Sequence, residues 1–99
     1  MEPQQLVTAR DQVVLVDVRE DHEWSAGHIE GALHIPLGRL AEELAGLPKD
    51  RMVVTVCRTG PRSERGARTL KEAGYDSDFL AGGVSAWASA GQTLVDDAG

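Results

Sequence analysis

The only cysteine of the 99-residue chain, Cys57, stands where an apolar run gives way to a helical pattern. The five residues before it, 52–56, are almost all aliphatic, and the loop Cys57-Arg-Thr-Gly-Pro-Arg62 follows. A loop between a buried strand and a helix directs backbone N–H groups at one point, where the helix dipole also favours negative charge. A thiol held there is shifted towards thiolate, the nucleophilic form of sulfur. We therefore predict that Cys57 is a catalytic nucleophile.

The free energy needed to ionise such a thiol is small. An unperturbed cysteine has a pKa of roughly 8.5, so about 3% of it is thiolate at pH 7. One pKa unit corresponds to about 1.4 kcal/mol, and a hydrogen bond to a charged group contributes about 1.5–3 kcal/mol. One or two loop amides therefore suffice to make the thiolate dominant. The alternative role of a lone cysteine is a small buried hydrophobic side chain, which does not require two arginines, a glycine and a helix start beside it.

Positive charge is concentrated around the cysteine, although the whole chain is acidic, with a net charge of −6 and a pI near 4.9. The acidic balance argues against nucleic acid as a partner. Segment 57–71 holds five cations and one anion, so it carries +4 and the rest of the chain −10. A salt-bridged helix face explains Arg68, which has glutamates four residues to either side. A salt-bridged face explains Arg58 and Arg62 poorly, because they lie in the loop or at the start of the predicted helix, where the helix dipole disfavours cations. We therefore predict a small anionic ligand at this loop.

Length and composition limit the fold and the cellular setting. Ninety-nine residues suffice for one domain, and we expect a core over about 4–91 and a C-terminal tail over 92–99. The longest aliphatic run, 13–16, is too short to span a membrane, and the N-terminus lacks the basic and apolar regions of a secretory signal. A single cysteine cannot form an internal disulfide. We therefore expect a cytoplasmic protein with no membrane partner.

The hydrophobic pattern alternates between strand and helix. Residues 13–18 and 52–56 form nearly continuous aliphatic runs, typical of strands buried on both faces of a parallel sheet. Alternating strands and helices predict an open α/β sheet, whose ligands bind at the carboxyl ends of the strands, where Cys57 is expected. Further strands are predicted over 32–35, 78–80 and, at an edge, 4–8; helices over 21–26, 37–47, 63–73 and 83–90; and a frayed acidic end over 96–99.

Four segments, read in order, resemble the rhodanese-like family of single-domain sulfurtransferases. They span about residues 13–91, nearly the whole domain, and their order and spacing make the resemblance specific. It implies a sheet of about five mostly parallel strands with helices on both faces, and a persulfide carried by the loop cysteine. The four segments are Leu15-Val-Asp-Val-Arg-Glu20, Gly27-His-Ile-Glu-Gly-Ala-Leu-His-Ile-Pro36, Cys57-Arg-Thr-Gly-Pro-Arg62 and Leu80-Ala-Gly-Gly-Val-Ser-Ala-Trp87.

The resemblance also implies a reaction. Cys57 would attack the outer sulfur of a small anionic donor such as thiosulfate, and the persulfide would then pass its sulfur to a thiol, cyanide or a protein. Gly60 is expected to let the loop curl, and Pro61 has no N–H to contribute. The side chains of Arg58 and Arg62 are expected to attract the sulfonate end of the donor. The backbone amides expected to hold the outer sulfur are those of Arg58, Thr59, Gly60, Arg62 and Ser63.

Other polar residues are expected to be structural. Asp17 lies in a buried apolar run, and Arg19 either reaches the rim of the pocket or pairs with Asp17. In the resembling motif His28 is structural, since a thiolate activated by its loop needs no separate base. Surface or packing roles are expected for His22 and His34, and a core position for Trp87. We expect no metal, no cofactor, and a monomer or weak homodimer.

Three other functions are consistent with the same residues. Related cysteine loops in phosphatases and arsenate reductases place five residues between cysteine and arginine, whereas four separate Cys57 from Arg62. The shorter loop suits a single sulfur atom better than a tetrahedral phosphate. A non-catalytic interaction module of the same fold would not need to retain Cys57. A persulfide carrier serving a protein partner is not distinguished from an enzyme by sequence.

Overall fold

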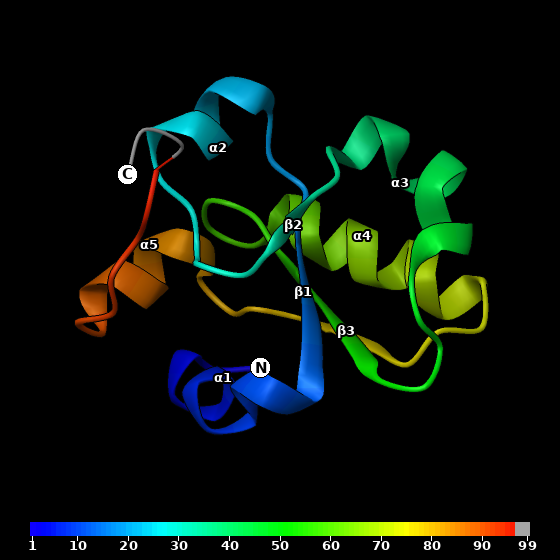
Figure 1. Cartoon of the computed structure of the whole chain (residues 1–99), viewed down its shortest axis with the longest axis horizontal. Helices are drawn as coiled ribbons and strands as arrows, with labels where there is room; N and C mark the ends of the chain where they lie inside the picture. Colours follow the sequence, from blue (N-terminus) through cyan, green and yellow to red (C-terminus); the bar gives the residue numbers. More distant parts are fainter. Residues whose placement is uncertain (97–99) are drawn as a thin grey trace.

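The chain forms a four-stranded parallel sheet in the order β2-β1-β3-β4. The computed structural model, shown in Figure 1, describes residues 1–96. The predicted parallel α/β fold is confirmed, with four strands in place of the expected five. The strands are β1 (Val13–Asp17), β2 (Leu33–His34), β3 (Met52–Val56) and β4 (Ser77–Phe79), and the helices are α1 (Pro3–Ala9), α2 (Asp21–Ala26), α3 (Leu37–Glu43), α4 (Pro61–Glu72) and α5 (Gly83–Ser89), with 3-10 turns at Arg10–Gln12 and Leu44–Gly46.

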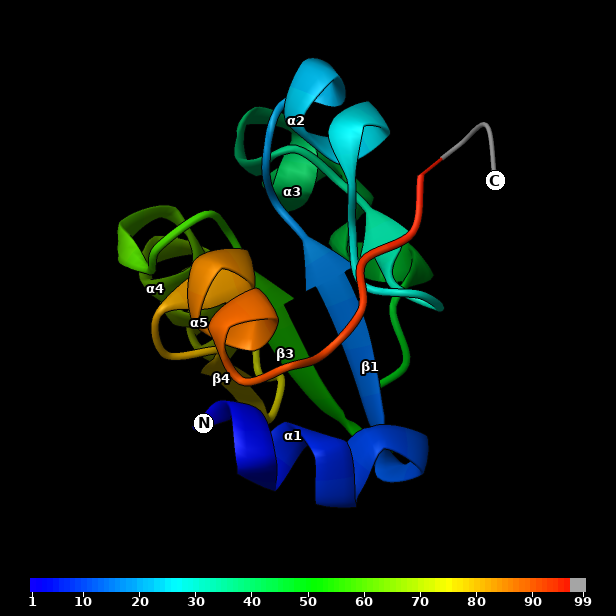
Figure 2. The same cartoon turned by 90° about the vertical axis from the view of Figure 1, so that its left-hand side faces the viewer.

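The edge strand predicted over 4–8 is wrong, because this segment forms α1. Pro3 occupies the first turn, where its fixed φ favours a helix. Glu2 and Gln5 form a reciprocal capping box around the free N–H groups of that turn. The helix buries Leu6 completely against the core. Figure 2 shows α1 lying at the amino ends of β1 and β3, opposite the end of the sheet that carries α2.

The helices cover both faces of the sheet, as predicted. Val54 and Val56 of β3 belong to one buried cluster, together with Leu6 of α1 and Trp87 of α5. Val53 points to the other face, whose cluster also contains Cys57 and side chains of α3 and α4. Successive residues of a strand face opposite sides, so the continuous aliphatic runs of β1 and β3 supply apolar surface to both layers.

The helix that follows the cysteine loop packs very closely on the sheet. A Cβ placed on Gly66 would lie 3.4 Å from Thr55 Cγ2 of β3 and 3.4 Å from Leu40 Cδ2 of α3. The absence of a side chain at Gly66 therefore lets α4 lie close to the strand that precedes Cys57. The helix begins at Pro61, two residues earlier than predicted, because proline is well suited to the first helical position.

The segment expected as a C-terminal tail partly packs on the body of the protein. His28 and Val95 exchange two backbone hydrogen bonds of 2.8 Å as an antiparallel bridge, and Leu94 packs against the core cluster that contains Trp87. Asp96 is exposed, and the rest of the predicted frayed end, 97–99, lies outside the described residues. Among residues 1–96, no helix is both long and apolar enough to cross a membrane.

Candidate active site

Cys57 follows the last residue of β3, at the carboxyl end of the sheet. Its residue surface is 1% exposed, and the Gly60 N–H donates a hydrogen bond to its sulfur at 3.0 Å. Gly60 has a φ of 147°, in the region that favours glycine, so the chain turns back over the sulfur as predicted. Pro61 then opens α4, where its missing N–H leaves no helical hydrogen bond unmade.

Hydrogen bonds favour the thiolate form of Cys57. Burial raises the pKa of the thiol, because it disfavours the charged form. The side chain and N–H of Ser63 and the N–H groups of Gly60 and Thr59 lower it by more, so the pKa of Cys57 lies below that of an ordinary cysteine. The positive end of the dipole of α4, a twelve-residue helix, acts in the same direction. The loop therefore favours a nucleophilic sulfur without a separate general base.

Ser63 links the loop, the sulfur and the neighbouring strand. It is fully buried, and its hydroxyl donates to the Gly60 carbonyl at 2.9 Å. A hydroxyl has a single proton, so at any moment the Ser63 hydroxyl donates either to this carbonyl or to the Cys57 sulfur. Thr55 of β3 donates its hydroxyl to the Ser63 carbonyl at 2.5 Å. These bonds fix the first turn of α4 against the strand.

The start of α5 supports the cysteine loop from the other side. Val84 N–H donates to the Cys57 carbonyl at 2.9 Å, and Ser85 N–H donates to the Arg58 carbonyl at 3.1 Å. Gly83 makes this approach possible, because a Cβ on it would lie 2.2 Å from the Cys57 carbonyl oxygen. Its φ of +59° also favours glycine. Gly83, the first residue of α5, therefore helps to position the nucleophile, a role that was not predicted from the sequence.

Arg62, expected to face an anionic donor, is bound by a carboxylate of α2. Its two terminal nitrogens donate to the two Glu23 carboxylate oxygens at 2.7 and 2.9 Å. The hydrogen bonds to Arg62 lower the pKa of Glu23 to about 2, and Glu23 in turn raises the pKa of Arg62. The pair is partly buried, with the side chains 29% and 18% exposed. Glu23 thus neutralises one of the two cations expected to bind the donor and ties the cysteine loop to α2.

Arg19 both pairs with Asp17 and reaches the rim of the pocket. Asp17 is 1% exposed and accepts three side-chain hydrogen bonds from Arg19, of 2.9 to 3.1 Å, at the end of β1. Arg19 also donates to the Gly27 carbonyl at 2.7 Å. A buried carboxylate that accepts this many bonds is held in place by them, in agreement with the structural role predicted for Asp17.

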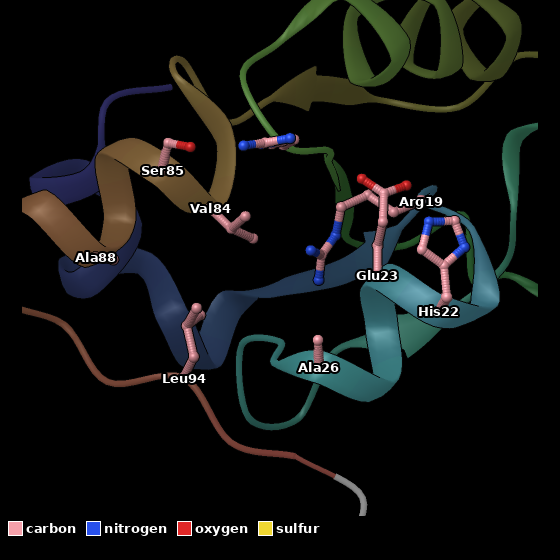
Figure 3. A pocket seen from close by; sticks show the side chains of 9 residues that line it. Arg19, His22, Glu23, Ala26, Val84, Ser85, Ala88 and Leu94 are labelled. Carbon is pink, nitrogen blue, oxygen red and sulfur yellow. The ribbon is translucent and has the colours of Figure 1, made fainter.

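A pocket of about 520 Å³ opens beside the cysteine loop, between α2 and α5. Figure 3 shows Glu23 and Ala26 on one side and Val84, Ser85 and Ala88 on the other. Cys57 does not itself line this pocket. Its backbone adjoins the wall, because Arg58 follows it in the chain and Val84 N–H donates to its carbonyl. The lining residues are Arg19, His22, Glu23, Ala26, Arg58, Val84, Ser85, Ala88 and Leu94.

Among residues 1–96, none of the three histidines hydrogen-bonds the Cys57 sulfur. The His28 ring stacks on Trp24 at 3.5 Å between centroids, and its Nδ1 lies 2.8 Å from the Trp24 carbonyl oxygen. His34 stacks on Trp24 at 4.8 Å. His22 is exposed at the mouth of the pocket. Within residues 1–96, no three His, Cys, Asp or Glu side chains come together as a candidate metal site.

The chain matches known proteins over most of its length. The Rhodanese-like domain family matches residues 2–90. The chain belongs to this family. It is 38% identical over 86 residues to a sulfurtransferase of Allochromatium vinosum, covering 86% of this chain and 80% of that protein. It is 37% identical over 82 residues to the thiosulfate sulfurtransferase GlpE of Shewanella oneidensis, covering 82% of this chain and 81% of GlpE.

The fold of this rhodanese-like domain also matches solved structures. A crystal structure of a rhodanese-related protein from Thermoplasma volcanium has a TM-score of 0.91 to this chain at 26% identity, over 96% of this chain and 95% of that one. Together with the sulfurtransferase relatives, the family match supports sulfur transfer as the general activity of the domain.

Proposed function

We propose that this domain is a sulfurtransferase that carries sulfane sulfur on Cys57, with thiosulfate as one donor. The observation that supports the proposal most directly is the hydrogen bond from Gly60 N–H to the Cys57 sulfur, at the N-terminus of α4. The thiosulfate sulfurtransferase named among its relatives supports the donor. The single cysteine favours a reducing compartment, and we extend the proposal to a cytoplasmic monomer or weak homodimer.

The first half-reaction loads the cysteine. The Cys57 thiol loses its proton to solvent, and the thiolate electron pair attacks the outer sulfur of thiosulfate. A new S–S bond forms, the S–S bond of the donor breaks, and sulfite leaves with that electron pair. The product is a Cys57 persulfide anion. Its outer sulfur carries the negative charge, which N–H groups of the loop stabilise as an oxyanion hole stabilises oxygen.

The second half-reaction releases the sulfur. An acceptor thiolate, cyanide or a protein thiol attacks the outer sulfur with its own electron pair. The persulfide S–S bond then breaks, and the pair returns to Cys57 as thiolate. The loop that stabilises the resting thiolate therefore also stabilises the leaving group. The two half-reactions predict double-displacement kinetics.

The ion pair at Arg62 weighs against phosphate-ester chemistry as the alternative. A phosphate dianion bound in the loop would use the arginine at its end, but both terminal nitrogens of Arg62 donate to Glu23. The loop also has one residue fewer between Cys57 and Arg62 than the phosphatase loops. A single sulfur atom needs neither the guanidinium nor the extra space.

Intact-mass analysis tests the proposal. Incubation with thiosulfate should add the mass of one sulfur atom to the protein, and cyanide should remove it with formation of thiocyanate. The Cys57→Ser variant should gain nothing. Hydrolysis of an aryl phosphate that depends on Cys57, without any sulfur uptake, would replace the proposal with the phosphatase reading.

A further inference from the structure

Glu23 of α2 holds the arginine that ends the cysteine loop. Arg62 lies in the chain between Gly60 and Ser63, whose N–H groups both hydrogen-bond the Cys57 sulfur. Its guanidinium interacts with that sulfur electrostatically, since a negative charge on Cys57 raises the pKa of Arg62. Both of its terminal nitrogens nevertheless donate to the Glu23 carboxylate, at 2.7 and 2.9 Å. The carboxylate therefore cancels most of the positive charge that Arg62 would bring to the sulfur.

The ion pair is protected from full screening by water. The side chains of Arg62 and Glu23 are only 29% and 18% exposed, and charges that are partly buried are screened less than exposed ones. The carboxylate comes from another element, α2, so it belongs to the fold and not to the loop itself. A negatively charged donor that approaches the loop therefore meets a pair that is close to neutral.

The other cation of the loop has no partner. Among residues 1–96, the exposed Arg58 guanidinium has neither an ion pair nor a hydrogen bond. The sequence predicts two free cations beside the sulfur, which would favour a dianion such as thiosulfate. The described side chains of 57–63 instead carry one free positive charge and one compensated charge. This balance suits a donor with a single negative charge.

We infer that Glu23 is a positioning residue for sulfur transfer, which restrains Arg62 and thereby limits the preference of the site for dianionic donors. The inference rests on the proposed function and names the favoured donors as monoanions, such as organic thiosulfonates. With methanethiosulfonate, the Cys57 thiolate attacks the outer sulfur, a new S–S bond forms and the S–S bond of the donor breaks. Methanesulfinate leaves with that electron pair, and Cys57 carries a persulfide anion.

Two donors that differ by one charge test the role of Glu23. Thiosulfate is a dianion and methanethiosulfonate a monoanion, and both present an outer sulfur to the same thiolate. The second-order rate constants of persulfide formation are measured by mass, and their ratio, thiosulfate over methanethiosulfonate, cancels any change in the thiolate fraction of Cys57. Glu23→Gln should raise this ratio about three- to tenfold, because the released Arg62 attracts the second charge more strongly than an exposed cation does.

A matched variant and a double replacement separate this effect from a loss of structure. Glu64 pairs with Arg68 of the same helix at 3.9 Å, and both side chains are exposed. Glu64→Gln removes the same charge and frees an arginine, but it should leave the ratio within about twofold of the wild type. Replacing both Glu23 and Arg62 with glutamine removes a neutral pair and should also restore the ratio to within about twofold. Equal changes for both donors in Glu23→Gln, an equal rise in Glu64→Gln, or a raised ratio in the double variant would overturn the inference.

Alkylation of Cys57 separates this inference from the proposed function, because it requires no sulfur transfer. Iodoacetate and iodoacetamide alkylate the same thiolate with loss of iodide and differ by one negative charge. Glu23→Gln should raise the ratio of the iodoacetate rate to the iodoacetamide rate about two- to fivefold, and the further change Arg62→Gln should remove that rise. This result would support the role of Glu23 even if the wild type took up no sulfur and the proposed function failed. Persulfide formation from both donors, with neither ratio changed by Glu23→Gln, would overturn the inference and leave the sulfurtransferase intact.

Discussion

Replacing Glu23 with glutamine should change how the stability of the fold depends on pH. The bond to Arg62 lowers the pKa of Glu23 from 4.5 to about 2. At about 1.36 kcal/mol per pKa unit, this pKa difference corresponds to a stabilisation of the folded state of about 3 kcal/mol. Because the folded-state pKa is the lower one, the stabilisation is complete well above pH 4.5 and is lost as the pH falls through 4.5 towards 2.

The expected size of the effect follows from these two pKa values. By pH 3 about 2 kcal/mol of the stabilisation should be lost, and partial hydration of the pair reduces this to about 1–2 kcal/mol. The free energies of unfolding of wild type and Glu23→Gln are measured in urea at pH 6 and at pH 3. The effect is the change, between the two pH values, in the difference between the two proteins. The contributions of the other carboxylates are present in both proteins and cancel in this difference. Glu42, an exposed glutamate of α3, provides the control, and Glu42→Gln should follow the wild type.

One result would refute this reasoning. If the wild type and Glu23→Gln lose stability in parallel between pH 6 and pH 3, the ion pair contributes nothing to the folded state. Arg62 would then be free to bind a donor, as the sequence alone suggested. The double replacement with Arg62→Gln supplies a second measure, because the coupling free energy between the two sites should be largest at pH 6.

Three further predictions concern the cysteine loop. The rate of iodoacetamide alkylation of Cys57 should rise with pH, with a midpoint below about pH 8.5, and Ser63→Ala should raise that midpoint. A midpoint at or above about pH 8.5 in the wild type would contradict the role of the loop amides. Gly83→Ala should lower the free energy of unfolding by more than Gly91→Ala and should abolish sulfur transfer. Both glycines have a positive φ, but only Gly83 lies against the loop carbonyls. Equal losses of stability in urea unfolding would show that this contact is unimportant. Arg58→Ala should slow turnover of thiosulfate more than turnover of an uncharged persulfide donor, with a smaller contrast in high salt; equal losses would assign Arg58 a structural role.

The central strands and the cysteine loop are predictable because local sequence determines them. The aliphatic runs of β1 and β3 have no alternative to burial, and a loop with Gly60 and Pro61 favours a turn into a helix. The N-terminal segment is less clear, because Leu6-Val-Thr8 resembles a short strand. The capping box between Glu2 and Gln5 stabilises a helix there. The hydrophobic pattern does not show this contribution, because it depends on the geometry of the first helical turn.

The remaining parts of the site depend on contacts between distant positions. Glu23 and Arg62 are 39 residues apart, and nothing in the local pattern of either shows which opposite charge it meets. The packing of Leu94 likewise depends on the bridge between His28 and Val95, which no periodicity reveals. The role of Gly83 did have a signal, since two successive glycines at the start of a helix suggest a close backbone approach.

The most direct test of the account is to follow each sulfur of thiosulfate separately. Thiosulfate labelled with heavy sulfur at the outer position and thiosulfate labelled at the inner position are incubated with wild type and Cys57→Ser, and the modified peptide is identified by mass. The account predicts that Cys57 gains one sulfur, heavy only when the outer position is labelled, and that the variant gains none. Uptake of the inner sulfur, uptake by Cys57→Ser, or no uptake by the wild type would contradict it.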